Sequence, residues 1–382
     1  MGKRKICCFC ERWSSGGIES FLCNLLEQMD LTKMEVDIVA AEWNESAFSV
    51  RLKEKGIHFV QLSGSMHNLR RNHRMFRKLL RQRRYDVVHL NLYQGLSLYY
   101  ARIARQECVP VRIVHSHNEA LRRSFLKPVK LLLHRWGRRC FTPDATALWA
   151  CSKAAADFLF GPHKAVTLIP NGIDTDRFRF DGDIRQAMRE ELGIADHLVL
   201  GTVGRLCSQK NQIFLLEVFA RLIQLRPDSR LLLVGEGEDR EMLERRAAQL
   251  GIQTKTIFCG RSAEVERLLW AMDVFALPSL FEGLSVAAVE AQAAGLPVLC
   301  SSGLSREVKL TKTTSFMPLE TGPKAWADKI MKMSHCETNR ERCADVVSAA
   351  GFEARVVAQS ISEAYLGRND GTANNFSYCP NL

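Results

Sequence analysis

Two carboxylates stand eight positions apart, Glu282 in a turn rich in Pro and Gly and Glu290 in an Ala- and Val-rich stretch that favours a helix. If this helix begins near Ser285, Glu282 lies beside its N-terminus, where the helix dipole and free N–H groups attract a phosphate. Glu290 then lies about a turn and a half further along the same helix. The spacing suits a ligand with both phosphate and hydroxyl groups, such as a sugar nucleotide.

The residues around Glu290 favour a functional carboxylate over a solvated one. An exposed loop Glu and an exposed helix Glu would explain the spacing alone equally well. However, the helix is apolar on nearly every side, which predicts burial, and Glu is seldom buried without a partner. The apolar neighbours are Val286, Ala287, Ala288, Val289, Ala291, Ala293 and Ala294.

A second motif joins an expected strand to a helix and carries two cations, Arg205 and Lys210, just before Asn211. Arg offers a planar fork of donors and Lys a mobile point charge, a pairing that suits a diphosphate. Taken alone, both could be ordinary surface cations. Their place after a strand favours ligand binding, because open α/β sheets bind ligands at the carboxyl ends of their strands.

Two further motifs follow expected strands nearer the N-terminus. Gly16 and Gly17 lie between a strand and a helix, where paired glycines let the backbone approach a phosphate, although an ordinary turn would also use them. His115 and His117 end another strand and precede Asn118. Their alternate spacing could suit a metal, but no third ligand is evident and a structural role is common for such residues.

Short apolar runs alternate with helical patterns along the chain, which is typical of doubly wound parallel α/β sheets. The runs form two sets, separated by a strand and turn at 166–178, so we predict two Rossmann-like halves. The expected strands are 5–9, 35–40, 86–90, 111–115 and 147–150, and then 198–203, 230–234, 256–259, 274–277 and 297–300.

The stretch around Glu282 and Glu290, with the strand before it and the turn Ala294–Leu299 after it, resembles the donor-site signature of family-four retaining glycosyltransferases. The similarity extends over roughly residues 5 to 367 in several motifs in the expected order. It implies the GT-B fold, with two Rossmann-like doubly wound domains facing a cleft. We assign an acceptor-side domain to 1–175, a donor-nucleotide domain to 176–351 and a helix that crosses back to 352–367. The tail 368–382 has little apolar content and is expected to be disordered.

The resemblance also implies residue roles. The expected catalytic residues, which contact the sugar or its leaving diphosphate, are Glu282, His117, Arg205 and Lys210. The expected donor-binding residues are Gly16, Gly17, Arg205, Lys210, Gly283, Leu284, Ser285 and Glu290, with Glu290 on the ribose. Asn118 and Asn91 lie on the acceptor side. Related enzymes often carry His where Asn91 stands and Pro where Ser285 stands, so these two positions depart from the pattern.

The implied activity is transfer of a hexosyl group, with retention, from a nucleotide-diphosphate sugar, expected to be a UDP-sugar. The implied acceptor is a saccharide, lipid-linked, in bacterial capsule or exopolysaccharide assembly. No metal or other cofactor is expected, because Arg205 and Lys210 would neutralise the diphosphate. Two alternatives remain open: a GT-B epimerase that acts on a nucleotide sugar, and a non-catalytic scaffold subunit that binds one.

Composition is consistent with a globular protein inside the cell. The 382 residues are 46% hydrophobic, yet no apolar stretch has the length of a membrane span and the N-terminus lacks a signal-peptide pattern. Thirteen cysteines, an odd and scattered set, predict reduced thiols and a cytoplasmic location. The one cluster, Cys7-Cys8-Phe9-Cys10, is interpreted as a buried strand and not as a metal site.

The net charge of +11 is concentrated in the first half of the chain. The stretches 69–84 and 121–139 mix many cations with Leu and Trp136, a composition that suits an anionic bilayer surface. A basic face packed on its own domain is an equally simple interpretation. We find no nucleic-acid-binding signature. The first of these interpretations predicts association with the inner face of the plasma membrane.

Overall fold

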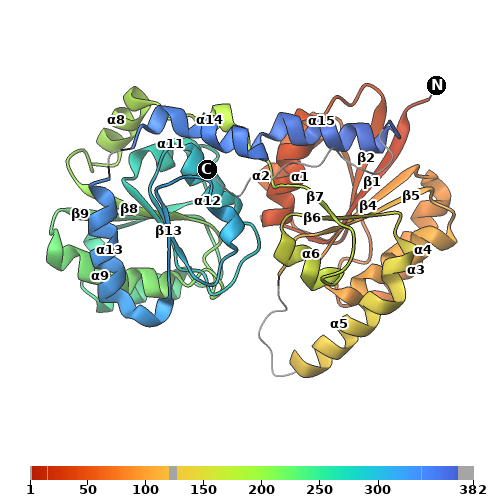
Figure 1. Cartoon of the computed structure of the whole chain (residues 1–382), viewed down its shortest axis with the longest axis horizontal. Coiled ribbons are helices and arrows are strands. Elements are labelled where there is room, and N and C mark those ends of the chain that lie inside the picture. The colour runs from red at the N-terminus through yellow and green to blue at the C-terminus, as the bar shows by residue number, and fades with distance from the viewer. Residues whose placement is uncertain (1, 15, 120–126, 337, 369–382) are drawn as a thin grey trace. The chain divides into compact units, whose positions relative to one another are not determined.

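The computed structural model describes residues 2–14, 16–119, 127–336 and 338–368. The chain forms two compact units, each an α/β body (Figure 1). Unit 1 comprises Met1–Gly172 together with Ala354–Leu382, and unit 2 comprises Ile173–Glu353. The structural divisions thus fall after Gly172 and Glu353, whereas the sequence placed them after residues 175 and 351. The predicted disordered tail lies outside the described residues, apart from Arg368.

Unit 1 is built on a seven-stranded sheet in the order β3-β2-β1-β4-β5-β6-β7, and all paired strands are parallel. In register, Cys10 of β1 pairs with Asn91 of β4, and Asn91 pairs with His115 of β5. The carboxyl ends of these strands therefore lie side by side. The strands are β1 (Arg4–Trp13), β2 (Met34–Trp43), β3 (His58–Gln61), β4 (Val87–Leu92), β5 (Val111–Ser116), β6 (Ala147–Ala150) and β7 (Thr167–Leu168).

Helices cover both faces of the unit 1 sheet. One core contains side chains of α1 (Gly17–Gln28), α2 (Ala47–Glu54) and α15 (Ala354–Tyr365). The other contains side chains of α3 (Leu69–Arg83), α4 (Tyr99–Gln106) and the end of α5 (Lys127–Phe141). The shorter elements are η1 (Gly95–Leu98), η2 (Thr142–Asp144) and α6 (Lys153–Leu159).

The cysteine cluster lies in the centre of β1. Cys7 and Phe9 point into one core, while Cys8 and Cys10 point into the other, and all four are fully buried. A strand buried on both faces has a continuous apolar run instead of an alternating one. The interpretation of this cluster as core is confirmed.

Unit 2 has a six-stranded parallel sheet in the order β10-β9-β8-β11-β12-β13. Its core is formed with α9, α10 and α13, and Figure 1 shows α8, α11, α12 and α14 on the other face. The strands are β8 (Leu198–Val203), β9 (Ser229–Val234), β10 (Thr256–Gly260), β11 (Val274–Leu277), β12 (Val298–Ser301) and β13 (Thr314–Met317). The helices are α7 (Thr175–Phe178), α8 (Gly182–Glu191), α9 (Gln212–Leu225), α10 (Arg240–Gln249), α11 (Val265–Ala271), α12 (Val286–Ala293), α13 (Gly322–Ser334) and α14 (Cys343–Val347).

Both strand orders are those of doubly wound Rossmann-like sheets, so the predicted fold class of the two domains is confirmed. The ten expected strands are present, with ends that shift by a few residues. The edge strands β3 and β13 were not predicted from the sequence. Both are short and only partly buried, so they lack the continuous apolar run that marks a central strand.

The C-terminal helix α15 belongs to unit 1. Val357, Ile361 and Tyr365 are buried in the same core as α1. The Tyr365 hydroxyl lies 2.6 Å from Nδ1 of His89 in the middle of β4. The last described helix therefore completes a core that the first residues of the chain began.

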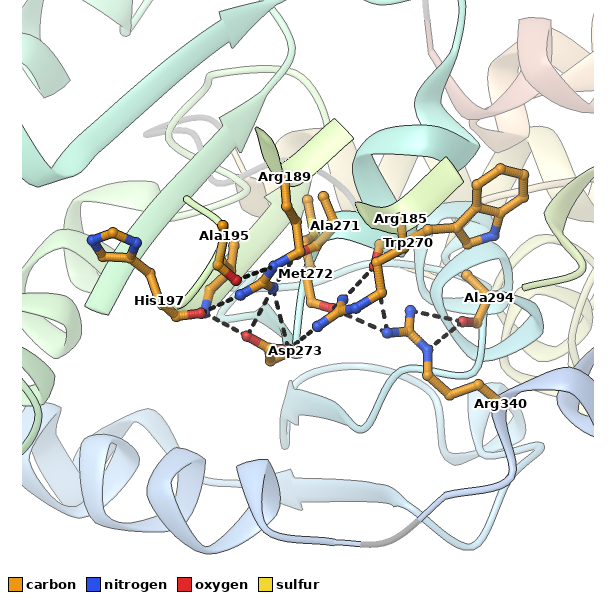
Figure 2. Close-up of polar contacts among 11 residues, drawn as sticks. Arg185, Arg189, Ala195, His197, Trp270, Ala271, Met272, Asp273, Ala294 and Arg340 are labelled. Carbon is orange, nitrogen blue, oxygen red and sulfur yellow. Dashed lines mark hydrogen bonds and ion pairs between the residues drawn. The ribbon is translucent and has the colours of Figure 1, made fainter. Parts of the chain in front are cut away.

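Three arginines converge on Asp273 and neighbouring carbonyls at the amino ends of β8 and β11 (Figure 2). Asp273 accepts hydrogen bonds from Arg185 at 2.6 Å and from Arg189 at 3.3 Å. Arg340 donates to the carbonyls of Trp270, Met272 and Ala294, at the C-terminal ends of α11 and α12. These guanidinium groups satisfy helix carbonyls that have no intrahelical partner. The cluster is a structural anchor at the edge of the sheet opposite the strands' carboxyl ends.

Candidate functional site

The N-terminus of α12 forms the first part of the site in unit 2. The helix begins at Val286 with Ser285 as its N-cap, which confirms the predicted start. The Ser285 hydroxyl is buried and has no hydrogen-bond partner among the described residues. The first N–H groups of a helix also lack intrahelical partners. This end of α12 therefore offers unused donors to an anion.

Glu282 and Lys210 form one ion pair beside that helix end. The Lys210 Nζ lies 2.6 Å from Oε1 of Glu282, which also accepts a hydrogen bond from the Ser279 hydroxyl. Glu282 is buried and Lys210 is partly buried. Because charge-assisted contacts strengthen away from water, the pair holds the cation at the loop where a phosphate is expected.

Two amides join the Lys210 loop to the Glu282 loop. Gln209 donates from Nε2 to the Phe281 carbonyl at 3.0 Å, and the backbone carbonyl of Gln209 accepts from Leu280 N at 2.9 Å. Asn211 donates from Nδ2 to the Pro278 carbonyl at 3.2 Å. These roles of Gln209 and Asn211 were not predicted from the sequence. The only sequence signal is the presence of amide side chains in a strand-to-helix loop.

Arg205 lies apart from the Lys210–Glu282 pair. Its Nε donates to Oε2 of Glu238 at 3.0 Å, and its side chain is exposed. Glu238 belongs to the turn after β9, which approaches the turn after β8 so closely that a Cβ on Gly235 would lie 2.1 Å from the Gly204 carbonyl oxygen. The structure therefore places the two predicted cations in separate ion pairs.

Glu290 is partly exposed as a whole residue, while its carboxyl group is desolvated by burial. It lies with Val286 and Ala287 on a side of α12 that keeps partial exposure, since the helix is buried mainly through Ala288, Val289 and its other apolar residues. Burial raises the pKa of Glu290 to about 7, opposed by the positive charges of Arg177 and Lys210. No hydrogen bond or ion pair to this carboxyl occurs among the described residues, so it is available to a ligand.

His117 is held in one tautomer at the carboxyl end of β5 in unit 1. Asn91 donates from Nδ2 to the Phe9 carbonyl at 3.3 Å, so its Oδ1 is the acceptor for His117 Nε2, 2.9 Å away. The hydrogen of the imidazole therefore lies on Nε2. Burial lowers the pKa of His117 to about 3. Nδ1 is buried, has no partner in the described part of the chain and can accept a hydrogen bond.

Asn91 thus has a role that the sequence analysis did not foresee, as the residue that orients His117. Asn118 is partly exposed beside it. Two other histidines extend the group, because the His115 ring lies 4.1 Å from the His117 ring and its Nδ1 lies 3.2 Å from Nε2 of His89. Burial also lowers the pKa values of both, so the three imidazoles are neutral.

The two glycines after β1 differ in their surroundings. Glu19 accepts hydrogen bonds from the N–H of Gly16 at 3.1 Å and of Ser14 at 2.9 Å. A Cβ on Gly16 would lie 2.7 Å from Oε2 of Glu19, whereas a Cβ on Gly17 would meet nothing within 4 Å. A Cβ at Gly16 would therefore displace the Glu19 carboxylate from its hydrogen bonds. Gly17, the first residue of α1, faces open space that a ligand could use.

A further buried carboxyl, that of Glu11, was not predicted from the sequence. It lies near the carboxyl end of β1 and accepts a hydrogen bond from the Ser97 hydroxyl of η1. Burial raises the pKa of Glu11. A carboxyl at this edge of the sheet belongs to the region where doubly wound folds bind ligands.

Within the described ranges, no group of three His, Cys, Asp or Glu side chains is arranged to hold a metal ion. No helix in those ranges is long and apolar enough to cross a bilayer. The cysteines there are all unpaired.

Two doubly wound units with candidate ligand groups at their strand ends define the GT-B class of α/β proteins. Residues 15–177 match the family described as Glycosyltransferase Family 4, and residues 184–348 match Glycosyl transferases group 1. EpsF of Bacillus subtilis (strain 168), which is named as a glycosyltransferase, is 30% identical over 92% of this chain and 93% of its own length. The chain therefore belongs to the family-four glycosyltransferases, as the sequence analysis predicted.

Other relatives carry more specific names. The UDP-Gal:alpha-D-GlcNAc-diphosphoundecaprenol alpha-1,3-galactosyltransferase of Escherichia coli is 31% identical over 59% of this chain and 60% of its own length. Among solved structures, Anabaena HepE in complex with UDP and glucose superposes with a TM-score of 0.75 at 20% identity, covering 94% of this chain and 99% of HepE. WaaG, a glycosyltransferase involved in lipopolysaccharide biosynthesis, gives 0.75 at 17% identity, covering 95% and 100%. The structural matches show the shared fold.

Proposed function

We propose that this glycosyltransferase moves a hexosyl group, with retention of configuration and without a metal ion, from a UDP-sugar to a lipid-linked saccharide in bacterial polysaccharide assembly. The observation that carries the proposal is the partly buried Lys210–Glu282 pair beside the unused donors at the N-terminus of α12. Lys210 suits a phosphate and Glu282 suits sugar hydroxyls, and the two side chains lie together beside the helix N-terminus.

In unit 2, the donor diphosphate would accept hydrogen bonds from the first N–H groups of α12 and from the hydroxyl of its N-cap, Ser285. Lys210 would exchange part of its contact with Glu282 for a phosphate oxygen, and Arg205 would leave Glu238 for the same group. Both exchanges keep each cation paired with an anion, so the desolvation cost is limited. Glu290, which has no partner among the described residues, would accept hydrogen bonds from the ribose hydroxyls.

The chemistry breaks the bond between the anomeric carbon and the phosphate oxygen and forms a bond from that carbon to an acceptor hydroxyl oxygen. The electron pair of the broken bond goes to the diphosphate, whose charge Lys210 and Arg205 stabilise. The acceptor proton passes to the leaving phosphate oxygen. In unit 1, Nδ1 of the neutral His117 is an acceptor without a partner among the described residues, which suits a sugar hydroxyl.

The named relatives support both the donor and the acceptor class. The Escherichia coli relative is named for UDP-Gal and a diphosphoundecaprenol acceptor, and HepE was solved with UDP. Other relatives are named for GDP-mannose, so the test includes both bases. We place the reaction at the cytoplasmic side of a membrane, since an odd and scattered set of cysteines suits a reducing compartment.

The test is protection of the purified protein against heat by UDP- and GDP-sugars, because a ligand that binds the folded state raises its apparent stability. We expect one UDP-sugar to protect the wild type, while Glu290→Ala and Lys210→Ala lose at least tenfold in donor affinity, about 1.4 kcal/mol each. Lys324→Ala, an exposed residue of α13, is the matched control and should bind normally.

The same assay separates the alternatives. Protection by a donor, followed by transfer to a lipid-linked saccharide with the anomeric configuration kept, supports the proposal. A changed nucleotide sugar without acceptor would identify an epimerase, and binding with no turnover on any acceptor would identify a scaffold subunit. Absence of protection by every donor would contradict the assigned site.

A further inference from the structure

Helix α5 exposes an apolar stripe to solvent. Val129, Leu132, Leu133 and Trp136 are 54%, 69%, 41% and 54% exposed. Their spacing of i, i+3, i+4 and i+7 puts them on one side of the helix, the arrangement with which a helix normally faces its core. Here the stripe faces away, so something outside the described protein would have to cover it.

The opposite side of α5 is fixed to unit 1 and prevents the stripe from turning inward. His134 accepts a hydrogen bond from Gly95 N at 2.9 Å and donates one to the Phe158 carbonyl at 3.0 Å. A Cβ on Gly137 would lie 2.5 Å from the Gly95 carbonyl oxygen, so the helix and η1 touch backbone to backbone. Phe141 is buried in the core. The outward orientation is therefore a property of the fold.

The charges around the stripe have one sign. From residue 127 to 141 the chain has no Asp or Glu, and the exposed Arg135 and Arg139 have no acidic partner in the described part of the structure. The neighbouring layer adds the exposed cations Arg70, Arg71, Arg74 and Lys78 of α3. A surface of apolar and cationic side chains is complementary to an anionic bilayer, which takes apolar groups below its phosphates and cations beside them.

The two basic stretches therefore differ in what they do. Helix α3 buries Phe76 and Leu80 against its own sheet, and its Arg77 and Arg81 pair with Glu107 at 3.2 and 2.7 Å. Apart from the exposed Leu69 at its start, its apolar side is thus covered within unit 1. Helix α5, by contrast, exposes its apolar stripe beside Arg135 and Arg139, which have no acidic partner among the described residues.

We propose that α5 docks on an anionic lipid bilayer, with Leu132, Leu133 and Trp136 inserted among the lipids and Arg135 and Arg139 at the phosphates. The biological role of this docking rests on the proposed function, because an enzyme that uses a lipid-linked acceptor must bind it at a membrane. A second copy of the chain is the less favourable occupant, since a two-fold contact would place like cations of the two α5 helices against each other.

The attachment of α5 gives this docking a consequence for unit 1. η1, which α5 contacts through Gly95, carries Ser97, and Ser97 holds Glu11 near the carboxyl end of β1. A bilayer bound by α5 would therefore be joined through one rigid contact to the edge of the sheet that carries His117. This arrangement suits an acceptor head group delivered from the lipid.

The experiment is co-sedimentation of the full chain with vesicles of phosphatidylcholine alone and of phosphatidylcholine mixed with phosphatidylglycerol. We expect binding to the mixed vesicles only, reduced at least about tenfold in Leu132→Ser/Trp136→Ser and in Arg135→Gln/Arg139→Gln. The control Leu225→Ser/Val356→Ser removes two side chains of similar exposure, 51% and 52%, and should bind like the wild type. The single variant Leu132→Ser keeps Trp136 and its contact with Phe141. Its weaker binding would therefore not come from a folding defect caused by loss of Trp136.

Wild-type failure to bind the mixed vesicles, or equal binding by all variants, would overturn the docking proposal. Loss of self-association in the Leu132→Ser/Trp136→Ser variant, without vesicle binding by the wild type, would assign the stripe to a second copy. Heat protection by nucleotide sugars, measured on the same samples, should be unchanged in every α5 variant. Vesicle binding without any donor protection would leave the docking intact and remove the proposed function.

Discussion

At the residue scale, the contrast between Gly16 and Gly17 separates a packing requirement from a ligand requirement. Gly17→Ala should leave thermal stability unchanged, because Ala suits the first turn of a helix and meets no atom, but should weaken donor use about tenfold. Gly16→Ala should lower the unfolding free energy by about 1–2 kcal/mol, because it displaces the Glu19 carboxylate from two N–H groups. Thermal unfolding and the donor KM give both quantities. Normal kinetics in Gly17→Ala would contradict a ligand at this turn.

Glu290 gives the donor site a dependence on pH. Its pKa is about 7 in the folded protein against an ordinary value of 4.5, so the folded state binds the extra proton between these values. The contribution of Glu290 to stability is therefore most favourable below about pH 4.5 and falls as pH rises to 7. Glu290→Gln should remove this fall and be more stable at pH 8, by on the order of 2 kcal/mol after allowance for partial exposure.

The same carboxyl should control nucleotide affinity in the opposite sense. Ribose hydroxyls donate best to the ionised form, so wild-type donor affinity should weaken as pH falls through 7. In Glu290→Gln the affinity should be lower and nearly flat across this range. Titration calorimetry from pH 6 to 8.5 measures both curves. Parallel curves for the two proteins would exclude Glu290 from the donor site.

Asn91 controls the hydrogen-bonding character of His117. In the wild type His117 is neutral above pH 4 and should produce no inflection in the pH profile of kcat. Asn91→Asp places a carboxylate at the position of the amide, which should raise the pKa of His117 and convert Nδ1 to a donor when the ring is protonated. We expect a new inflection and at least tenfold lower kcat at pH 6. Asn91→Leu should lower kcat without that inflection.

At the element scale, the three arginines around Asp273 hold the C-terminal ends of α11 and α12 (Figure 2). Asp273→Asn removes the carboxylate that Arg185 and Arg189 share, so the unfolding free energy should fall by about 2–3 kcal/mol. Donor affinity should change little, because the cluster lies at the amino edge of the sheet. Urea unfolding and calorimetry test both statements. Arg267→Gln, which removes exposed surface ion pairs, is the control and should cost below about 1 kcal/mol.

At the scale of the whole molecule, unit 1 is discontinuous in sequence while unit 2 is continuous. A chain that ends at Glu353 loses Val357, Ile361 and Tyr365 from the core of unit 1 and leaves His89 Nδ1 unpaired. We expect unit 1 to unfold or become sensitive to protease, while unit 2 keeps a separate thermal transition and nucleotide protection. A chain ending at Arg368 should behave like the full protein. Loss of both transitions together would show that the units fold as one.

The sequence by itself determined the two doubly wound sheets and the position of Glu282 beside the start of α12. These features depend on local periodicity and on the rule that parallel strands end at one edge. Edge strands such as β3 fell outside this reasoning, because their partly exposed side chains do not form a buried run.

Only the tertiary structure decided which groups meet. The sequence predicted the same phosphate-binding role for Lys210 and Arg205. In the fold, however, Lys210 pairs with Glu282 and Arg205 pairs with Glu238. Tyr365 reaches His89 across 276 positions, a contact that no local pattern contains. Likewise, the spacing of the apolar residues on α5 is typical of a core-facing side, but the opposite side of the helix packs on unit 1 and the stripe is exposed. Partner choice and side-chain direction are long-range properties, because they depend on which surfaces the folded elements bury.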